Sequence, residues 1–133
     1  MSVVPDGDRR WQAGLAAYAS QFQIPEDEVH EYLRSRLGER LATEAILASG
    51  AAWTDDCLSH RDRSLVVLAA LTVQGGVEAR VRTHARWALD HGATPEELEA
   101  LATLLAVYAG YPKASLAMEV FREVIAEYDA AGH

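Results

Sequence analysis

His84 is the first of two histidines in the segment RTHARWALDHGAT, whose apolar spacing predicts a helix. The apolar residues that share its side of this helix are Val77, Val81, Ala85 and Ala88. The imidazole therefore lies on or beside a buried stripe. Two interpretations follow. Either His84 is a core residue bonded to a backbone carbonyl, or it is an acid/base group, because a reference pKa of about 6.5 suits proton transfer near neutral pH.

Metal and thiol chemistry are not expected. His91 follows His84 by seven residues, which is roughly 10.5 Å along a helix that rises about 1.5 Å per residue. Two imidazoles that far apart cannot bind one metal ion without a break in the helix. Cys57 is the single cysteine, which excludes an internal disulfide, a CxxC pair and a multi-cysteine metal site. The sequence contains neither an HExxH motif nor a glycine-rich phosphate loop.

Arg63 stands near the start of the most apolar predicted helix, directly before Ser64 and Leu65. On the surface, its guanidinium would form an ion pair with Asp62 or Glu78. In a site, the same planar group would bind a substrate carboxylate through two parallel hydrogen bonds. The sequence leaves both interpretations open.

Three further residues are candidates for contact with a substrate. Tyr108 shares a helix face with Leu101 and Leu105, which favours a packing role or a place in a pocket wall. Trp53 is expected to anchor the core or an interface. Cys57 is a lone thiol in a predicted loop. We include Tyr108, Trp53 and Cys57 in the predicted substrate-binding set.

The composition restricts the class of protein. The chain has 133 residues, of which 50% are hydrophobic and 24% charged, and this fits one soluble globular domain over residues 1–133. A formal net charge of −8 and the lack of a basic stripe argue against nucleic acid as a partner. No segment has the roughly 18 apolar residues of a membrane span, and the start MSVVPDGDRRW lacks the apolar core of a secretory signal. We therefore expect a cytoplasmic protein.

The chain is predicted to be helical throughout, because no run alternates strictly between apolar and polar residues. Helices are expected over about residues 8–20, from Pro25, from 36 to near Gly50, and over 59–74, 77–91, 94–109 and 111–130. The expected capping residues are Ser59 with Asp62, and Thr94 with Pro95 and Glu97, while Gly75, Gly92 and Gly110 are expected to end helices.

Two of these helices carry more apolar surface than a domain of this size covers by itself. Residues 65–73 are apolar nearly all round, so their helix is expected to be buried on most sides. Residues 98–109 are similarly apolar. Partner subunits would cover the remaining apolar surface of these helices. The sequence therefore predicts a homo-oligomer.

Three blocks of sequence follow one another between Trp53 and Pro112. They are W-x5-S-x3-RSLV from Trp53 to Val66, H-x3-AL-x2-GAT from His84 to Thr94, and YAG-x-P from Tyr108 to Pro112. In this order and at these intervals the blocks resemble the carboxymuconolactone decarboxylase family. The resemblance covers about residues 38–125 and leaves residues 1–37 as additional N-terminal helices of the same domain.

This resemblance implies an all-α, alkylhydroperoxidase D-like fold of about six to seven helices, built round an antiparallel pair and assembled as trimers or hexamers. It also implies a cofactor-independent enzyme that removes CO2 from a small carboxylated lactone. His84 matches the family's helix histidine and becomes the acid/base candidate. Arg63 is carried over as a second catalytic candidate.

The chain departs from the family pattern at several positions. Some relatives have an acid four residues before the histidine, where this chain has Arg80, and Glu78 is then the nearby acidic candidate. Related thiol peroxidases use a CxxC pair, which Cys57 alone cannot provide. Two hypotheses follow: a decarboxylase-like lyase or isomerase acting on a carboxylated lactone or cyclic keto acid, and a non-catalytic oligomeric binding or scaffold protein that kept the fold.

Overall fold

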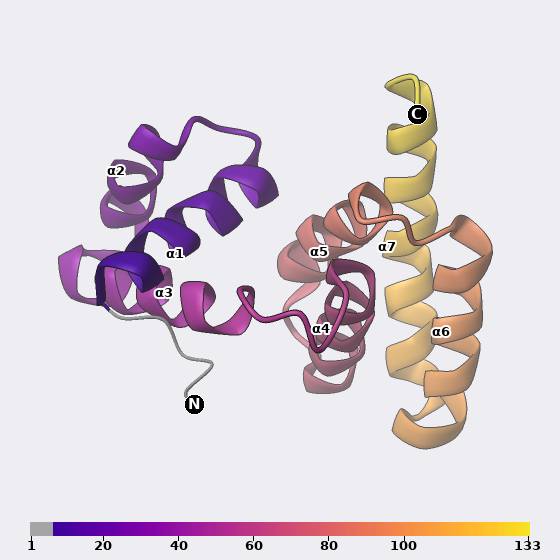
Figure 1. The fold of residues 1–133 in the computed structure, drawn as a ribbon. Coiled ribbons are helices and arrows are strands. Elements are labelled where there is room, and N and C mark those ends of the chain that lie inside the picture. The colour runs from indigo at the N-terminus through magenta and orange to yellow at the C-terminus, as the bar shows by residue number, and fades with distance from the viewer. Residues whose placement is uncertain (1–6) are drawn as a thin grey trace. The chain divides into compact units, whose positions relative to one another are not determined.

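The computed structural model describes residues 7–133, which form α-helices and no strand (Figure 1). The seven helices of these described residues are α1 (Gly7–Phe22), α2 (Glu26–Leu37), α3 (Glu39–Ala52), α4 (His60–Gln74), α5 (Glu78–Asp90), α6 (Pro95–Ala109) and α7 (Tyr111–Ala130). The prediction of an all-α chain with about six to seven helices is confirmed. The expectation that no secretory signal is present rests partly on residues 1–6, which lie outside the described residues.

The helices divide into two compact units, which are described separately. The first unit lies within residues 1–57 and contains α1, α2 and α3, and the second covers residues 58–133 and contains α4 to α7. Among the described residues, no helix combines the length and the apolar character that crossing a membrane requires.

In the first unit, α1 and α3 pack so closely that only glycine fits at two points. A Cβ atom added to Gly14 would overlap the carbonyl oxygen of Ile46, and one added to Gly50 would overlap that of Arg10. The prediction that a helix stops near Gly50 is confirmed, since α3 ends at Ala52. The glycine serves close approach between helices, which is a tertiary requirement and not a local stop signal.

In the second unit, α4 and α5 form one antiparallel hairpin, and α6 and α7 form another (Figure 1). The buried centre is made by Leu68 from α4, Val81, Ala85 and Ala88 from α5, Leu98 and Ala102 from α6, and Ala117, Phe121 and Val124 from α7. α5 packs against both α4 and α7. The buried residues of α5 form an apolar stripe, and groups at the edge of this stripe are partly removed from water.

Short-range sequence signals mark the first and last residues of these helices as predicted. The Ser59 Oγ accepts a hydrogen bond from the Asp62 N–H at 3.0 Å, and Thr94 and Glu97 form a complete reciprocal capping box. Gly75 follows α4 with a φ of 71°, a conformation that favours glycine. The turn between α4 and α5 is therefore defined by its own residues.

The prediction that α4 is buried on most sides is wrong for the single chain. The residues of α4 that are buried are Arg63, Ser64, Leu68 and Thr72. Val66 and Val73 are 60% and 45% exposed. The helix packs against α5, α6 and α7 along this one stripe, so its remaining apolar residues face outward.

The close approach of α1 and α3 leads to a prediction about Gly50. Gly→Ala inside a helix usually stabilises a protein by roughly 0.5–1 kcal/mol. Here the added methyl group meets backbone, so Gly50→Ala should instead lower the free energy of unfolding by about 1–3 kcal/mol. Urea unfolding followed by circular dichroism measures this. Glu44→Ala, an exposed change on the same helix, should stay within about 0.5 kcal/mol of the parent. A Gly50→Ala variant as stable as the parent would contradict the packing argument.

Candidate functional site

His84 lies at the edge of the apolar stripe of α5, as its spacing predicts. Val81, Ala85 and Ala88 of the same helix are buried, while His84 itself is half-buried. Its Nδ1 atom is buried and has no hydrogen-bond partner among the described residues. Nε2 is therefore the ring nitrogen that remains for exchange of a proton with a ligand or water.

The surroundings of His84 keep its imidazole uncharged. Burial lowers the pKa of His84 to about 4, and the nearby positive charge of Arg80 contributes in the same direction. A protonated ring would carry an N–H at the buried Nδ1, where no acceptor is available to stabilise the charge. At neutral pH His84 is thus a neutral imidazole that accepts a proton readily only when a negative charge comes close.

Two residues of α5 flank this imidazole on the same side of the helix. Arg80 precedes His84 by four residues and is exposed. Trp87 follows by three residues, is 2% exposed, and meets the imidazole edge to face, with ring centroids 5.9 Å apart and an interplanar angle of 61°. The packed indole restricts the orientation of the imidazole, and Arg80 places a cation one helical turn away.

Arg63 is buried, so the interpretation that places it on the helix surface is wrong. Its side chain is 7% exposed, and its Nη1 donates a hydrogen bond to the carbonyl oxygen of Leu58, just before α4 begins. The carboxylate of Asp62 accepts from Arg61 at 3.0 Å. Arg63 thus ties the chain entering α4 to the buried stripe of that helix.

Glu78 lies at the start of α5 and faces a different direction from His84. Six residues separate them, which corresponds to roughly 9 Å along the axis and about 120° around it. Glu78 lines a cavity of about 30 Å³ together with Thr72, Val81 and Lys113. Thr72 Oγ1 is buried there without a hydrogen-bond partner among the described residues. The structure therefore does not bring Glu78 beside the imidazole.

The three predicted substrate-binding residues belong to different units of the chain. Tyr108 is 82% exposed on α6, so the expectation that it packs into the core is wrong for the single chain. Trp53 caps the end of α3 and Cys57 follows in a loop, and both belong to the first unit. Cys57 is a free, exposed cysteine whose backbone N–H donates to Asp55 Oδ1 at 2.9 Å.

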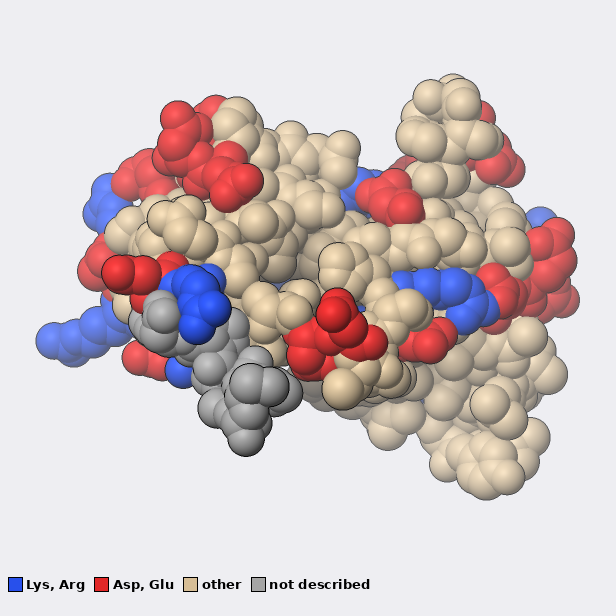
Figure 2. Space-filling view, viewed as in Figure 1, with Lys and Arg blue, Asp and Glu red and all other residues tan. Residues whose placement is uncertain are grey.

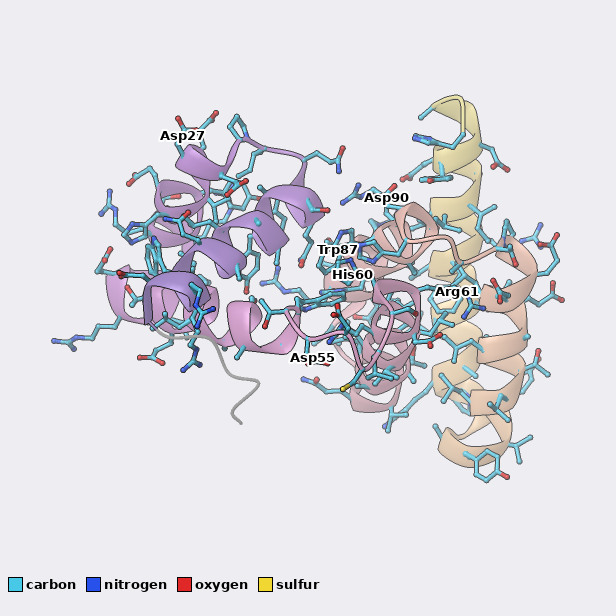
Figure 3. The ribbon with its side chains drawn as sticks, in the orientation of Figure 1. Asp27, Asp55, His60, Arg61, Trp87 and Asp90 are labelled. Carbon is cyan, nitrogen blue, oxygen red and sulfur yellow. The ribbon has the colours of Figure 1, made fainter. Side chains whose placement is uncertain are left out.

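Sequence reasoning missed a cluster where α4 begins and α5 ends. Ser64, which is 0% exposed, and His91 are joined by a hydrogen bond of 2.7 Å between Oγ and Nδ1. The ring of His91 also lies 5.1 Å from that of His60 and 4.7 Å from that of Trp87. Figure 3 labels His60, Trp87 and Asp90 close together at these helix ends. Burial and the neighbouring His60 lower the pKa of His91.

This cluster orients side chains and is not suited to nucleophilic catalysis. Ser64 is fully buried, so its hydroxyl cannot reach a substrate. The spacing of three and four residues between His84, Trp87 and His91 would have placed them on one side of a helix. His60 and Ser64 come from another helix, and their approach depends on how α4 and α5 pair. Within the described residues, no three His, Cys, Asp or Glu side chains are grouped to hold a metal ion.

Comparison with known proteins agrees with this fold. Residues 41–123 match the model of the carboxymuconolactone decarboxylase family. The chain is 34% identical over 84 residues to the 4-carboxymuconolactone decarboxylase of Acinetobacter baylyi, covering 63% of this chain and 62% of that protein. It is 32% identical over 81 residues to an uncharacterized 15.0 kDa protein of Paracoccus denitrificans, covering 60% of each chain. The chain thus spans less than two thirds of the length of the curated relatives it matches.

The helical fold and the extent of the family match together define the class of protein. The chain belongs to the carboxymuconolactone decarboxylase family. The resemblance inferred from the three sequence blocks is confirmed.

The lowered pKa of His84 predicts acid sensitivity. In the unfolded chain the imidazole binds a proton near pH 6.5, whereas in the folded chain it does so near pH 4. Between these values the unfolded chain holds more protons, so stability falls as the pH falls from about 6.5 to 4, by up to about 3 kcal/mol from this group. Urea unfolding at a series of pH values should show this loss in the parent and a smaller one in His84→Gln.

Measurements near pH 8 provide the internal control, because His84 is neutral in both states there. The parent and His84→Gln should then differ only by a pH-independent amount. Identical pH dependence of the two proteins below pH 6.5 would show that His84 is not held in its neutral form by the fold.

Proposed function

We propose that this chain is a cofactor-independent, decarboxylase-like enzyme that acts on a small carboxylated lactone or cyclic keto acid. The observation that carries this proposal is the half-buried neutral imidazole of His84, held beside the apolar stripe of α5 in a chain of this family. The relative from Acinetobacter baylyi is named a 4-carboxymuconolactone decarboxylase, which supports the type of reaction.

In the proposed reaction, the protein mainly positions the substrate and supplies a proton. The bond between the carboxylate carbon and the adjacent ring carbon breaks, and its electron pair moves into a conjugated carbonyl of the substrate. Carbon dioxide leaves, and the resulting enolate is protonated on carbon. Because the substrate supplies the electron sink, the protein has to hold the carboxylate, stabilise the enolate and deliver the proton.

His84 is the residue that transfers this proton. Its neutral form predominates in the ligand-free chain, since the pKa is about 4. Binding of an anionic substrate favours protonation of the ring through Nε2, and the imidazolium then donates to carbon as negative charge develops on the enolate. Trp87 keeps the ring oriented during both steps, because it packs against it edge to face.

Arg63 and Glu78 take supporting positions in this proposal. Arg63 holds the start of α4 through its hydrogen bond to the Leu58 carbonyl. Glu78 lies at the other end of α5 and lines the separate small cavity. Neither is required to exchange a proton with the substrate. Tyr108, Trp53 and Cys57 stay candidates for substrate contact.

The decisive experiment replaces His84 with glutamine. Glutamine retains a polar group of similar reach but cannot transfer a proton near neutral pH, so turnover should fall by roughly 10²–10⁴-fold while the fold persists. Release of CO2 is followed with a panel of carboxylated lactones and cyclic β-keto acids, and circular dichroism verifies folding. Unchanged turnover of any substrate that the parent accepts would refute the catalytic role of His84.

The second proposed property is assembly into a homo-oligomer, such as a trimer or a dimer of trimers. The described chain exposes a set of large apolar side chains on α6 and the start of α7, namely Leu104 (56%), Val107 (77%), Tyr108 (82%) and Tyr111 (74%). Contiguous apolar surface of this kind usually contacts a partner. Assembly without catalysis is also the property expected of the alternative, a binding or scaffold protein.

Assembly is tested by light scattering at micromolar concentration. The parent should give a multiple of the 14.5 kDa chain mass, and Val107→Asp should shift it toward the monomer, because the charge would be buried in the interface. Ala126→Asp adds the same charge at an exposed position of α7 and should leave the mass unchanged. A monomeric parent would refute the proposed assembly.

A further inference from the structure

One arginine of α5 is placed to take part in the site. Arg80 and His84 are separated by four residues, so their side chains leave the helix on the same face with Cβ atoms about 5–6 Å apart. Both belong to a single continuous helix, α5. Their spacing therefore depends on helix geometry alone and not on the packing of one element against another.

The other arginines of α5, and Arg63 of α4, have hydrogen-bonding groups that are already engaged. On α5, Arg82 pairs with Glu123 and Glu127, and Arg86 pairs with Asp90 at 2.8 Å. Arg63 of α4 is 7% exposed and donates to the Leu58 carbonyl. A substrate would have to displace existing partners, or open the fold, to reach any of these guanidinium groups.

Arg80 differs from these arginines in its exposure and in its lack of a partner. Its side chain is exposed, and within the described residues it makes no hydrogen bond or ion pair. It is also the charged group whose field lowers the pKa of His84. A guanidinium with its fork open to solvent binds a carboxylate through two parallel, charge-assisted hydrogen bonds.

We propose that Arg80 binds the carboxylate of the substrate and so places the leaving group one helical turn from the His84 imidazole. This inference rests on the proposed function and adds the residue that binds the carboxylate that leaves as CO2. Arg80 thereby becomes the determinant of specificity for an anionic substrate. Uncharged lactones of the same shape lack the group that it recognises.

The same contact couples substrate binding to protonation of His84. The bound carboxylate neutralises the field of Arg80 and adds a negative charge near the ring, so the pKa of His84 rises and the imidazole takes a proton from water. When the carboxylate leaves as neutral CO2, its negative charge passes to the enolate. The proton then moves from His84 to carbon, which returns the imidazole to its neutral form and restores the unpaired guanidinium.

The test uses the full chain and γ-carboxy-γ-butyrolactone, a saturated lactone carboxylate that has no conjugated carbonyl to accept electrons. Nuclear magnetic resonance of ring-labelled histidine follows the protonation of His84, whose signals are assigned by their loss in His84→Gln. The probe should bind the parent and raise the pKa of His84. The uncharged γ-butyrolactone should leave the pKa unchanged.

Arg80→Gln removes the cation at an exposed position, so the fold should be retained. In this variant the probe should bind roughly tenfold more weakly or worse, the loss expected for hydrogen bonds to a charged group. Without ligand, the pKa of His84 should rise, because the nearby positive charge is gone. Arg122→Gln makes the same charge change at an exposed residue of α7 and should reproduce the parent in both measurements.

The outcomes separate this inference from the proposed function. Equal affinity of the parent and Arg80→Gln for the probe, or no binding of the probe to the parent, would overturn the role of Arg80. Binding that depends on Arg80, in a protein that releases CO2 from no member of the substrate panel, would support the carboxylate site and refute the decarboxylase. With an active substrate, Arg80→Gln should raise KM more than it lowers kcat.

Discussion

The chemistry proposed for this chain depends on how closely α5 packs against α4 and α7. The inward side of α5 combines the smaller residues Val81, Ala85 and Ala88 with the larger side chains of Trp87 and Leu89, and all of them are buried. At the edge of this packed side, the Nδ1 atom of His84 is buried, and the indole of Trp87 packs against its ring. A wetter position would leave the imidazole with its ordinary pKa of about 6.5, so that roughly a quarter of it would be charged at pH 7. The packing thus sets the charge state of the ring before any substrate binds.

The helices were largely predictable because their ends are encoded locally. The capping box of Thr94 and Glu97, the Ser59 cap and the glycine after α4 act through residues a few positions apart. The packing role of Gly50 was not predictable, because this glycine lets α1 pass close by, which depends on residues far away in sequence. The exposure of Val66 and Tyr108 was missed for a related reason: an apolar pattern shows that a face avoids water but not which surface covers it.

The site was predictable to the extent that it lies on one helix. The spacing of α5 placed His84 beside the buried stripe, and the same spacing puts Arg80 on its face and turns Glu78 away. The burial of Arg63 and the contact between His60 and His91 were not predictable, because both depend on how α4 pairs with the rest of the second unit. Residue type indicated which side chains are reactive. The pairing of helices decided which of these side chains are buried or already bonded to another residue.

Net charge explains why an unpaired cation matters in this particular chain. At −8, the protein as a whole repels a carboxylate, although salt limits that repulsion to a Debye length of about 8 Å under physiological conditions. On the face shown in Figure 2, basic residues form small separate groups among the acidic ones and no continuous stripe. Several arginines are neutralised by salt bridges, including Arg34 with Glu31 and Arg61 with Glu97. Attraction of an anionic substrate must therefore come from a cation within contact distance of the site. Arg80 meets that requirement because its charge already acts on His84 and its guanidinium has no other partner in the described chain.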